Sequence, residues 1–303
     1  MPDLTSGSVQ ANGINFHYLE MGEGPLALCM HGFPDHAYSF RHLLPDLAKA
    51  GFRGIAPFMR GYAPTEAPKD GRYQTALLSL DVLALIGALG FDQAYLIGND
   101  WGATAVSGAA VLGPEKVTKL VTIASGRADE DLRMDFQFLK GTWHSYYFQL
   151  PAAEATLAHN DFEFIEAWWR DAAPEWDIPE EYIQSIKETF RKPGVVEAAL
   201  GYYRATYNQA LQDPSLEDAQ KRITAGPITV PTLALHGTSD RPKRIDAFES
   251  GSMDRFFTGG LEKVIITGTG HFMHQEKPGE VNPRILEFLA RFDTDLRWIH
   301  FYR

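Results

Sequence analysis

Six short apolar runs recur along this chain of 303 residues, with longer stretches of helical character between them. Runs of this length are typical of strands that are buried on both faces, and their alternation with helices is typical of a parallel sheet. We therefore expect an α/β fold in which helices cover both faces of a mostly parallel central sheet. The runs occupy residues 26–30, 54–57, 94–97, 120–123, 232–235 and 264–267.

Two segments add detail to the first part of this fold. Residues 9–18 contain the turn signal Asn12-Gly13 and predict an antiparallel hairpin. Residues 77–89 are apolar nearly all round and stop at Gly90, which predicts a buried crossover helix with a glycine at its C-terminal cap. This helix should lead directly into the strand over residues 94–97.

The strand pattern disappears between about residue 128 and residue 225, where the sequence becomes helical, aromatic and interrupted by prolines. The borders of this region are polar or broken by proline and glycine, as linkers are. We therefore expect three parts in chain order. Residues 1–127 form the first part of the core, residues 128–225 form an inserted helical cap, and residues 226–303 complete the core.

The bulk composition limits the partners of the chain. Its formal charge of -11 and its pI near 5.4 argue against nucleic acid or an anionic membrane, because both attract clustered positive charge. The one cysteine, Cys29, lies inside an apolar run, so no disulfide forms within the chain and we expect the thiol to be buried. No signal peptide or membrane span is recognised, and we expect a cytoplasmic protein.

The pentapeptide at residues 98–102, Gly-Asn-Asp-Trp-Gly, lies where the apolar run 94–97 is followed by a helix of small residues. In a G-x-nucleophile-x-G elbow, the glycines let the strand turn sharply into the helix and lift the central side chain into a site. That side chain is Asp100. A carboxylate is an anion at neutral pH and can attack a saturated carbon directly, whereas a serine needs a base. The sequence therefore predicts alkyl electrophiles as substrates, not acyl groups.

Two later strands are followed by residues that complete such a site. Asp240 follows the run 232–235 and is the candidate orienting acid, and His271 follows the run 264–267 and is the candidate general base. The order nucleophile, acid, histidine is expected of hydrolases built on this kind of sheet. Because parallel strands deliver active residues at their carboxyl ends, we expect Asp100, Asp240 and His271 to meet there.

The tetrapeptide at residues 31–34, His-Gly-Phe-Pro, directly follows the run 26–30. Its proline stiffens the turn. We expect the backbone N–H of Phe33 and that of Trp101, the residue after the nucleophile, to form a two-donor oxyanion hole. These residues imply no metal and no organic cofactor.

Taken together, these motifs resemble the α/β-hydrolases of the epoxide hydrolase and haloalkane dehalogenase group, over nearly the whole chain. The resemblance implies an α/β-hydrolase fold with a cap, and an alkyl ester on Asp100 that is hydrolysed by water activated by His271, with Asp240 as the third member of the triad. The motifs that carry it are His31-Gly32-Phe33-Pro34, Met59-Arg60-Gly61-Tyr62, Gly98-Asn99-Asp100-Trp101-Gly102, Gly237 with Asp240, and Gly270-His271.

Branches of this group differ in how they treat the leaving group. An opening epoxide needs proton donors for its oxygen, and epoxide hydrolases usually supply them from two cap tyrosines. Tyr203 with Arg204 resembles the second tyrosine of the family, and His144 stands where the first is usual, as in a His/Tyr subgroup of epoxide hydrolases. We therefore expect an epoxide hydrolase that forms a vicinal diol, with His144 and Tyr203 placed over Asp100.

A haloalkane or haloacid dehalogenase with the same triad is the enzymatic alternative. Haloalkane dehalogenases share the tryptophan after the nucleophile, but the usual second donor, an asparagine after His-Gly, is replaced here by Phe33. The second donor would then be a cap tryptophan, such as Trp143, Trp168, Trp169 or Trp176. Fluoroacetate dehalogenases carry arginines at and just beyond the elbow, where this chain has Trp101, Thr104 and Ser107. A ligand-binding protein without turnover is the alternative from another class, and an intact triad counts against it.

The aromatic cap predicts a small, neutral, hydrophobic substrate, with Phe33, Trp101, Tyr147 and Phe272 lining its site. The aromatic and basic tail over residues 296–303 fits packing either on the core or on a second subunit of a homodimer. Arg60 is interpreted as a scaffold residue that binds loop carbonyls or a carboxylate. Other residues compete for the catalytic roles: His274 for the base, Asp129 or Glu130 for the acid, and Tyr202 or Tyr207 for the cap tyrosine.

Overall fold

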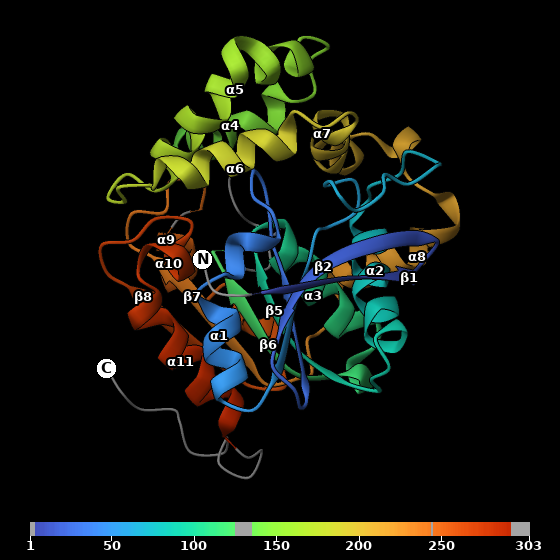
Figure 1. Cartoon of the computed structure of the whole chain (residues 1–303), viewed down its shortest axis with the longest axis vertical. Coiled ribbons are helices and arrows are strands. Elements are labelled where there is room, and N and C mark those ends of the chain that lie inside the picture. Colours follow the sequence, from blue (N-terminus) through green and yellow to red (C-terminus); the bar gives the residue numbers. More distant parts are fainter. Residues whose placement is uncertain (1–3, 125–134, 244, 292–303) are drawn as a thin grey trace.

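The computed structural model of the chain describes residues 4–124, 135–243 and 245–291 (Figure 1). An eight-stranded sheet lies at its centre, in the order β1-β2-β4-β3-β5-β6-β7-β8. The pairs β1/β2 and β2/β4 are antiparallel and all other neighbouring pairs are parallel, which confirms the expected sheet. The strands are β1 (Thr5–Ala11), β2 (Ile14–Met21), β3 (Leu26–Met30), β4 (Arg53–Pro57), β5 (Ala94–Asn99), β6 (Val117–Ile123), β7 (Thr232–Gly237) and β8 (Leu261–Ile266).

Each predicted apolar run falls on one of the strands β3 to β8. The largest difference is at β8, which begins three residues before the predicted run and ends one residue before its end. β8 pairs only with β7 and is half-buried along most of its length, so its first half tolerates the charged residues Glu262 and Lys263. The predicted hairpin is confirmed as β1 and β2, and both Asn12 and Gly13 adopt the positive φ of a type I′ turn.

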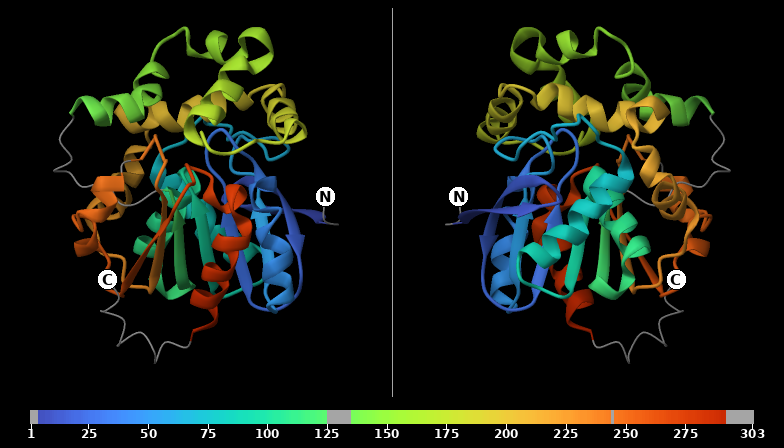
Figure 2. Two further views of the ribbon diagram at one scale, coloured as in Figure 1. Left: turned by 90° about the vertical axis from the view of Figure 1, so that its left-hand side faces the viewer. Right: turned by 90° about the vertical axis from the view of Figure 1, so that its right-hand side faces the viewer.

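Helices cover both faces of the sheet, as expected. Helices α2, α3 and α8 pack together on one face, and α1 and α11 pack together on the other (Figure 2). The predicted crossover helix is α2, which begins two residues earlier than expected and is followed by Gly90 at a φ of 89°. The helices around the sheet are α1 (Leu43–Lys49), α2 (Thr75–Ala88), α3 (Trp101–Leu112), α8 (Glu217–Ala225), α9 (Ile245–Glu249), α10 (Met273–Glu276) and α11 (Pro278–Ala290).

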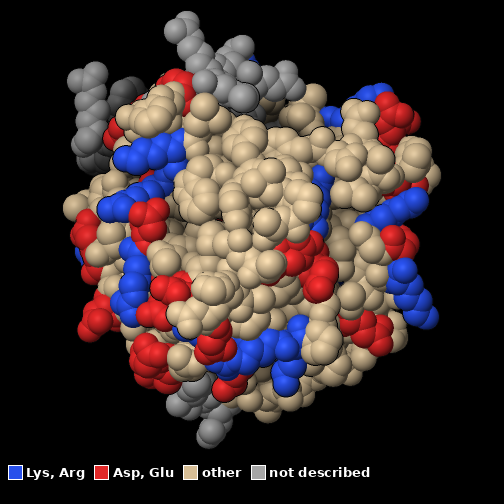
Figure 3. Space-filling view, turned by 90° about the horizontal axis from the view of Figure 1, so that it is seen from above, with Lys and Arg blue, Asp and Glu red and all other residues tan. Residues whose placement is uncertain are grey.

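Four further helices stand between β6 and β7 in the chain and lie over one end of the sheet (Figure 1). They are α4 (Phe136–Tyr147), α5 (Ala153–Ala172, broken over residues 159–162), α6 (Glu180–Phe190) and α7 (Val195–Tyr207). Seen from above, neutral side chains occupy much of the outer surface, and charges of both signs lie mostly toward its edges (Figure 3). The division at residues 127/128 and 225/226 stays a prediction.

Cys29 is fully buried in β3, as expected. None of the helices in the described ranges combines the length and the apolar character that a membrane crossing requires. The tail over residues 296–303, assigned above either to the core or to a second subunit, lies outside the described residues.

Candidate active site

Asp100 occupies the sharp turn between β5 and α3. Its backbone has φ 51° and ψ -116°, a region that non-glycine residues rarely adopt and that marks a strained elbow. A Cβ added to Gly98 would come within 2.5 Å of the Gly102 backbone, and one added to Gly102 would lie 1.9 Å from the Met30 carbonyl oxygen. Only glycine therefore fits at both ends of the pentapeptide, and the tight turn presents Asp100 above the sheet.

His271 lies between two carboxylates. Its Nδ1 is 3.1 Å from both oxygens of Asp240, and its Nε2 is 3.3 Å from Oδ2 of Asp100. The imidazole is fully buried, and Asp240 is 8% exposed. The carboxyl ends of β5, β7 and β8 thus bring together the three residues that the sequence assigned to a triad.

The main chain of the His271 loop is tied to two other elements. The Asn99 side-chain amide donates to the carbonyl oxygens of Ile123, at 3.2 Å, and of His271, at 3.1 Å. The His271 N–H donates to the carbonyl oxygen of Ala172 in α5, at 2.9 Å. The sequence showed Asn99 only as a member of the elbow motif, so this bridging role emerges from the structure.

Glu276 is a second residue that sequence reasoning missed. Its Oε2 accepts a hydrogen bond from the Gly270 N–H at 2.7 Å, and its Oε1 accepts one from the Phe272 N–H at 2.9 Å. The carboxylate therefore holds the peptide groups on both sides of His271. Burial raises the pKa of Glu276 to about 7, although the two N–H groups act in the opposite direction.

The charges of the site keep Asp100 anionic. Burial alone would raise its pKa, but the hydrogen bond and charge of His271, the charge of Lys243 and the Phe33 N–H hold the pKa well below its usual range. Burial likewise opposes the charged form of His271. The nearby charge of Asp240 and the hydrogen bonds with Asp100 and Asp240 outweigh burial and raise the pKa of His271 to about 9.

The backbone groups predicted for the oxyanion hole lie beside the nucleophile. The Phe33 N–H donates to Oδ1 of Asp100 at 3.0 Å. Trp101 is the first residue of α3, where N–H groups have no partner within the helix. The Phe33 N–H therefore lies next to the carboxyl group of Asp100, where an oxyanion would form if water attacked an ester at this position, and the Trp101 N–H remains the expected second donor.

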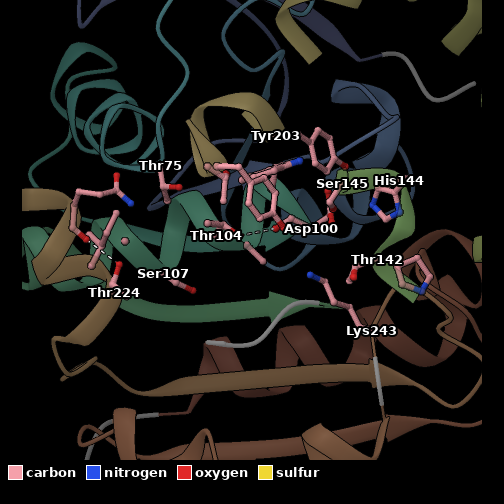
Figure 4. A pocket seen from close by; sticks show the side chains of 18 of the residues that line it. Thr75, Asp100, Thr104, Ser107, Thr142, His144, Ser145, Tyr203, Thr224 and Lys243 are labelled. Atoms are coloured by element: carbon pink, nitrogen blue, oxygen red, sulfur yellow. Dashed lines mark hydrogen bonds between the residues drawn. The ribbon is translucent and has the colours of Figure 1, made fainter. Parts of the chain in front are cut away.

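A cavity of about 430 Å³ opens over Asp100 (Figure 4). Trp101 and Asp100 line it from the core side, His144 lines it from α4, and Tyr203 lines it from α7. The sequence-predicted cap pair and the predicted nucleophile therefore share one cavity. Hydroxyl-bearing side chains from three helices also line the cavity. They are Thr75 of α2, Thr104 and Ser107 of α3, and Thr224 of α8.

Tyr203 and His144 are packed among aromatic rings. The Tyr203 ring centroid is 4.9 Å from that of Phe148, 5.0 Å from that of Trp101 and 5.6 Å from that of His144. Burial and the charge of Asp100 raise the pKa of Tyr203 well above its ordinary value, so the hydroxyl keeps its proton. Burial lowers the pKa of His144 to about 3, so the imidazole is neutral at physiological pH.

Three of the four residues predicted to line the substrate site, Phe33, Tyr147 and Phe272, are not among the residues that line the cavity. The Tyr147 hydroxyl pairs with Thr156 Oγ1 at 2.6 Å, and Phe272 is fully buried in a stack on Trp169 with 3.6 Å between ring centroids. Phe33 is also fully buried beneath Tyr203, and it reaches the site through its N–H group.

The structure gives the surroundings of three of the residues that compete for the catalytic roles, namely His274, Tyr202 and Tyr207. His274 Nε2 pairs with Ser39 Oγ at 2.8 Å, and the Tyr202 hydroxyl donates to the Arg60 carbonyl oxygen at 2.9 Å, so both side chains have structural partners. Tyr207, the other rival, lines the cavity but is 50% exposed. Asp129 and Glu130, the rivals of Asp240, lie outside the described residues.

Arg60 has the scaffold role expected of it. Its guanidinium donates to both oxygens of buried Asp81, at 2.5 and 2.6 Å, and to the carbonyl oxygen of Arg72 at 2.9 Å. Within the described ranges, no group of three or more His, Cys, Asp and Glu side chains is arranged to hold a metal ion.

A family model described as "alpha/beta hydrolase fold" matches residues 25–278. Among curated relatives, epoxide hydrolase 2 of Siraitia grosvenorii is 30% identical, and the alignment covers 96% of this chain and all of the relative. The match agrees with the resemblance that the motifs had indicated.

Solved structures give the same picture. An epoxide hydrolase from Vigna radiata superposes with a TM-score of 0.82 at 28% identity, covering 96% of this chain and 99% of the other. Epoxide hydrolase A from Mycobacterium thermoresistibile superposes with a TM-score of 0.78 at 28% identity, covering 94% and 98%. The similarity thus extends over both the sheet and the helices above it.

Proposed function

This chain belongs to the alpha/beta hydrolase fold family, and from that premise we propose that it is an epoxide hydrolase that opens an epoxide to a vicinal diol. One observation carries the proposal. Tyr203 from α7 and His144 from α4 line the same cavity as Asp100, while His271 Nε2 lies 3.3 Å from Oδ2 of Asp100. A carbon electrophile in this cavity would meet the nucleophile on one side and groups that can hydrogen-bond its oxygen on the other.

In the first step, the Asp100 carboxylate attacks a ring carbon, and the bond from that carbon to the epoxide oxygen breaks. The oxygen leaves as an alkoxide and takes a proton from the Tyr203 hydroxyl, while a His144 N–H donates a hydrogen bond to it. The low pKa of Asp100 supports its role as an anion, and the high pKa of Tyr203 keeps its proton available until the alkoxide forms.

In the second step, His271 activates a water molecule. Ester formation removes the negative charge of Asp100, one of the two carboxylates that raise the pKa of His271, so the imidazolium becomes easier to deprotonate. The proton that His271 releases replaces the one that Tyr203 gave up, so the Tyr203 hydroxyl is restored.

The neutral imidazole then takes a proton from water as the water oxygen bonds to the Asp100 carbonyl carbon, and the Phe33 and Trp101 N–H groups stabilise the oxyanion. The oxyanion collapses, and the bond from this carbon to the substrate-bound ester oxygen breaks. That oxygen takes a proton from the new Asp100 carboxyl group, which releases the diol and leaves Asp100 as a carboxylate and His271 as an imidazolium.

The dehalogenase alternative finds less support at this site. A leaving halide needs N–H donors, and Trp101 is the one tryptophan among the described residues that line the cavity. The Trp169 indole donates to the Pro34 carbonyl oxygen at 3.3 Å, and Trp143 is 44% exposed. Trp168 has its ring centroid 5.6 Å from that of His144 and 5.9 Å from that of His271, but it is not among the residues that line the cavity. The ligand-binding alternative leaves the contacts of His271 with Asp100 and Asp240 without a purpose.

Turnover of a small panel of aryl and alkyl epoxides, with halide release from matched haloalkanes measured in parallel, tests the function. We expect diol formation from epoxides, and halide release without diol formation would contradict the proposal. A single turnover in water enriched in oxygen-18 tests the mechanism. We expect label in the Asp100 carboxylate, and label that appears only in the diol would refute the ester.

The location and assembly of the protein stay predictions. We propose a cytoplasmic enzyme because Cys29 is a single buried thiol. Fractionation with compartment markers would test this location. The homodimer is a second prediction, and light scattering of the full chain would test it.

A further inference from the structure

Lys243 is the one lysine or arginine among the described residues that line the cavity. It stands on the loop after β7, and its backbone N–H donates to Oδ1 of Asp240 at 3.0 Å. Its side chain is half-buried and lines the same cavity as Asp100, Tyr203 and His144. Figure 4 shows it reaching toward the cavity from the side where Thr142 and His144 lie. The hydrogen bond to Asp240 fixes the start of this side chain relative to the proposed triad.

The ammonium group of Lys243 has no carboxylate partner within the described part of the chain. Nearby arginines differ in this respect, because Arg241 pairs with Asp171 and Arg204 pairs with Glu154. The positive charge of Lys243 is one of the causes that lower the pKa of Asp100 and the pKa of His144. A cation that is partly removed from water without a partner is costly, and an anion in the cavity would offset that cost.

We propose that the enzyme acts on epoxides whose substituent carries a carboxylate, and that the Lys243 ammonium binds this carboxylate in the cavity. The inference rests on the proposed epoxide hydrolase function. It replaces the expected neutral substrate with an anionic one. The aromatic rings near Asp100 still contact the hydrophobic part of the substituent, and the hydroxyls of Thr104 and Ser107 add polar surface to the wall.

The test compares each acid with its neutral amide of nearly the same shape. The probes are 3-phenylglycidate and 4-(oxiran-2-yl)benzoate, each with its primary amide, and the readout is the ratio of kcat/KM for acid over amide. We expect the wild-type ratio to exceed one for at least one pair. In Lys243→Met that ratio should fall by about 10- to 100-fold, mainly through KM for the acid, because a hydrogen-bonded ion pair is lost.

Two variants serve as controls. Lys243→Arg keeps the charge and should retain most of the preference. Lys221→Met removes an exposed lysine that pairs with Glu217 on α8, so it changes the net charge equally and should leave the ratio unchanged. The inference would be overturned if the acid-to-amide ratio of kcat/KM in Lys243→Met stayed within twofold of the wild-type ratio for both pairs. Equal losses of kcat/KM on acid and amide in this variant would also overturn it. So would a wild-type enzyme that prefers the amide in both pairs. Absence of diol from every probe and from styrene oxide would instead overturn the proposed function.

Discussion

The two sides of the cavity are built in different ways. On the core side, Asp100, Asp240 and His271 follow strand ends and are linked by side-chain hydrogen bonds of 3.1 to 3.3 Å. On the side of the predicted cap, Tyr203 projects from α7 and His144 from α4, and both are placed by edge-to-face packing of aromatic rings.

This contrast indicates that the two sides of the cavity have different roles in the proposed reaction. In the proposed mechanism, the parallel sheet holds the groups that form and break the ester, because neighbouring strands are hydrogen-bonded and end at one edge. In the same mechanism, the helices above the sheet contribute the groups that interact with the departing oxygen, and the positions of these groups depend on side-chain packing. Changes on the core side should therefore abolish the reaction, whereas changes on the cap side should affect mainly ring opening.

The largest effect is expected from Asp100→Asn. An amide is a poor nucleophile, so kcat should fall by at least about 10⁴-fold. Single-turnover kinetics with mass spectrometry of the active-site peptide would measure the loss. Mass spectrometry also detects deamidation back to aspartate, and undiminished turnover in protein that has kept the amide would refute Asp100 as nucleophile.

The same variant should change the titration of His271. The folded chain raises the pKa of His271 from 6.5 to about 9, so the stabilisation by its charged form is complete below pH 6.5 and is lost as pH rises toward 9. Without the Asp100 charge, the pKa should be lower and the loss of stability over this window smaller. Denaturant unfolding at several pH values, with NMR of the imidazole, would check this. An unchanged imidazole titration would contradict the predicted coupling.

On the cap side, Tyr203→Phe should lower the rate of ester formation by roughly 10²- to 10⁴-fold, because the departing oxygen loses its proton donor. Burst-phase measurements on an epoxide would isolate this step. Tyr202→Phe is the matched control, since its hydroxyl donates to the Arg60 carbonyl oxygen and faces away from the reaction. It should cost about 1 kcal/mol of stability and leave ester formation intact. Equal losses in the two variants would argue against Tyr203 as the donor.

Glu276→Gln should have a smaller effect on the core side. One N–H beside His271 would face an amide NH₂ group, so we expect kcat to fall by about 10-fold with KM little changed. Glu276 has a pKa raised from 4.5 to about 7, so the folded wild type retains a proton that the unfolded chain releases, and its stability falls as pH rises between these values. The variant should gain stability relative to wild type over that window. If the free energies of unfolding of wild type and Glu276→Gln changed in parallel with pH, the raised pKa of Glu276 would be contradicted.

The smallest effect is expected where cap and core meet outside the cavity. The Tyr182 hydroxyl of α6 donates to buried Asp35 at 2.6 Å, and Asp35 also accepts from Gln275 at 2.7 Å. Tyr182→Phe should lower stability by about 1 to 3 kcal/mol without altering ester formation. Thermal unfolding monitored beside burst kinetics would separate the two. A change in the burst rate without a loss of stability would reverse this interpretation.

The sequence predicted the core much better than the cap. Strands β3 to β7 were found because they are buried on both faces and read as continuous apolar runs, whereas charged residues at the start of the edge strand β8 hid its beginning. In the predicted cap, Tyr203 was chosen by resemblance. Tyr147 of the cap and Phe33 and Phe272 of the core were expected in the lining of the cavity, and none of the three is among the residues that line it. A helical period shows which side chains share a face but does not show what that face contacts.

The sequence by itself determined that a carboxylate stands at a strand-to-helix turn, and that an acid and a histidine follow two later strands. Those placements follow from local rules, since parallel strands end at one edge of their sheet whatever the details of packing. Only the tertiary structure decided that Glu276 braces the His271 loop and that Lys243 faces the cavity. Such contacts depend on how loops and helices distant in sequence pack together, and no periodicity in the chain encodes that packing.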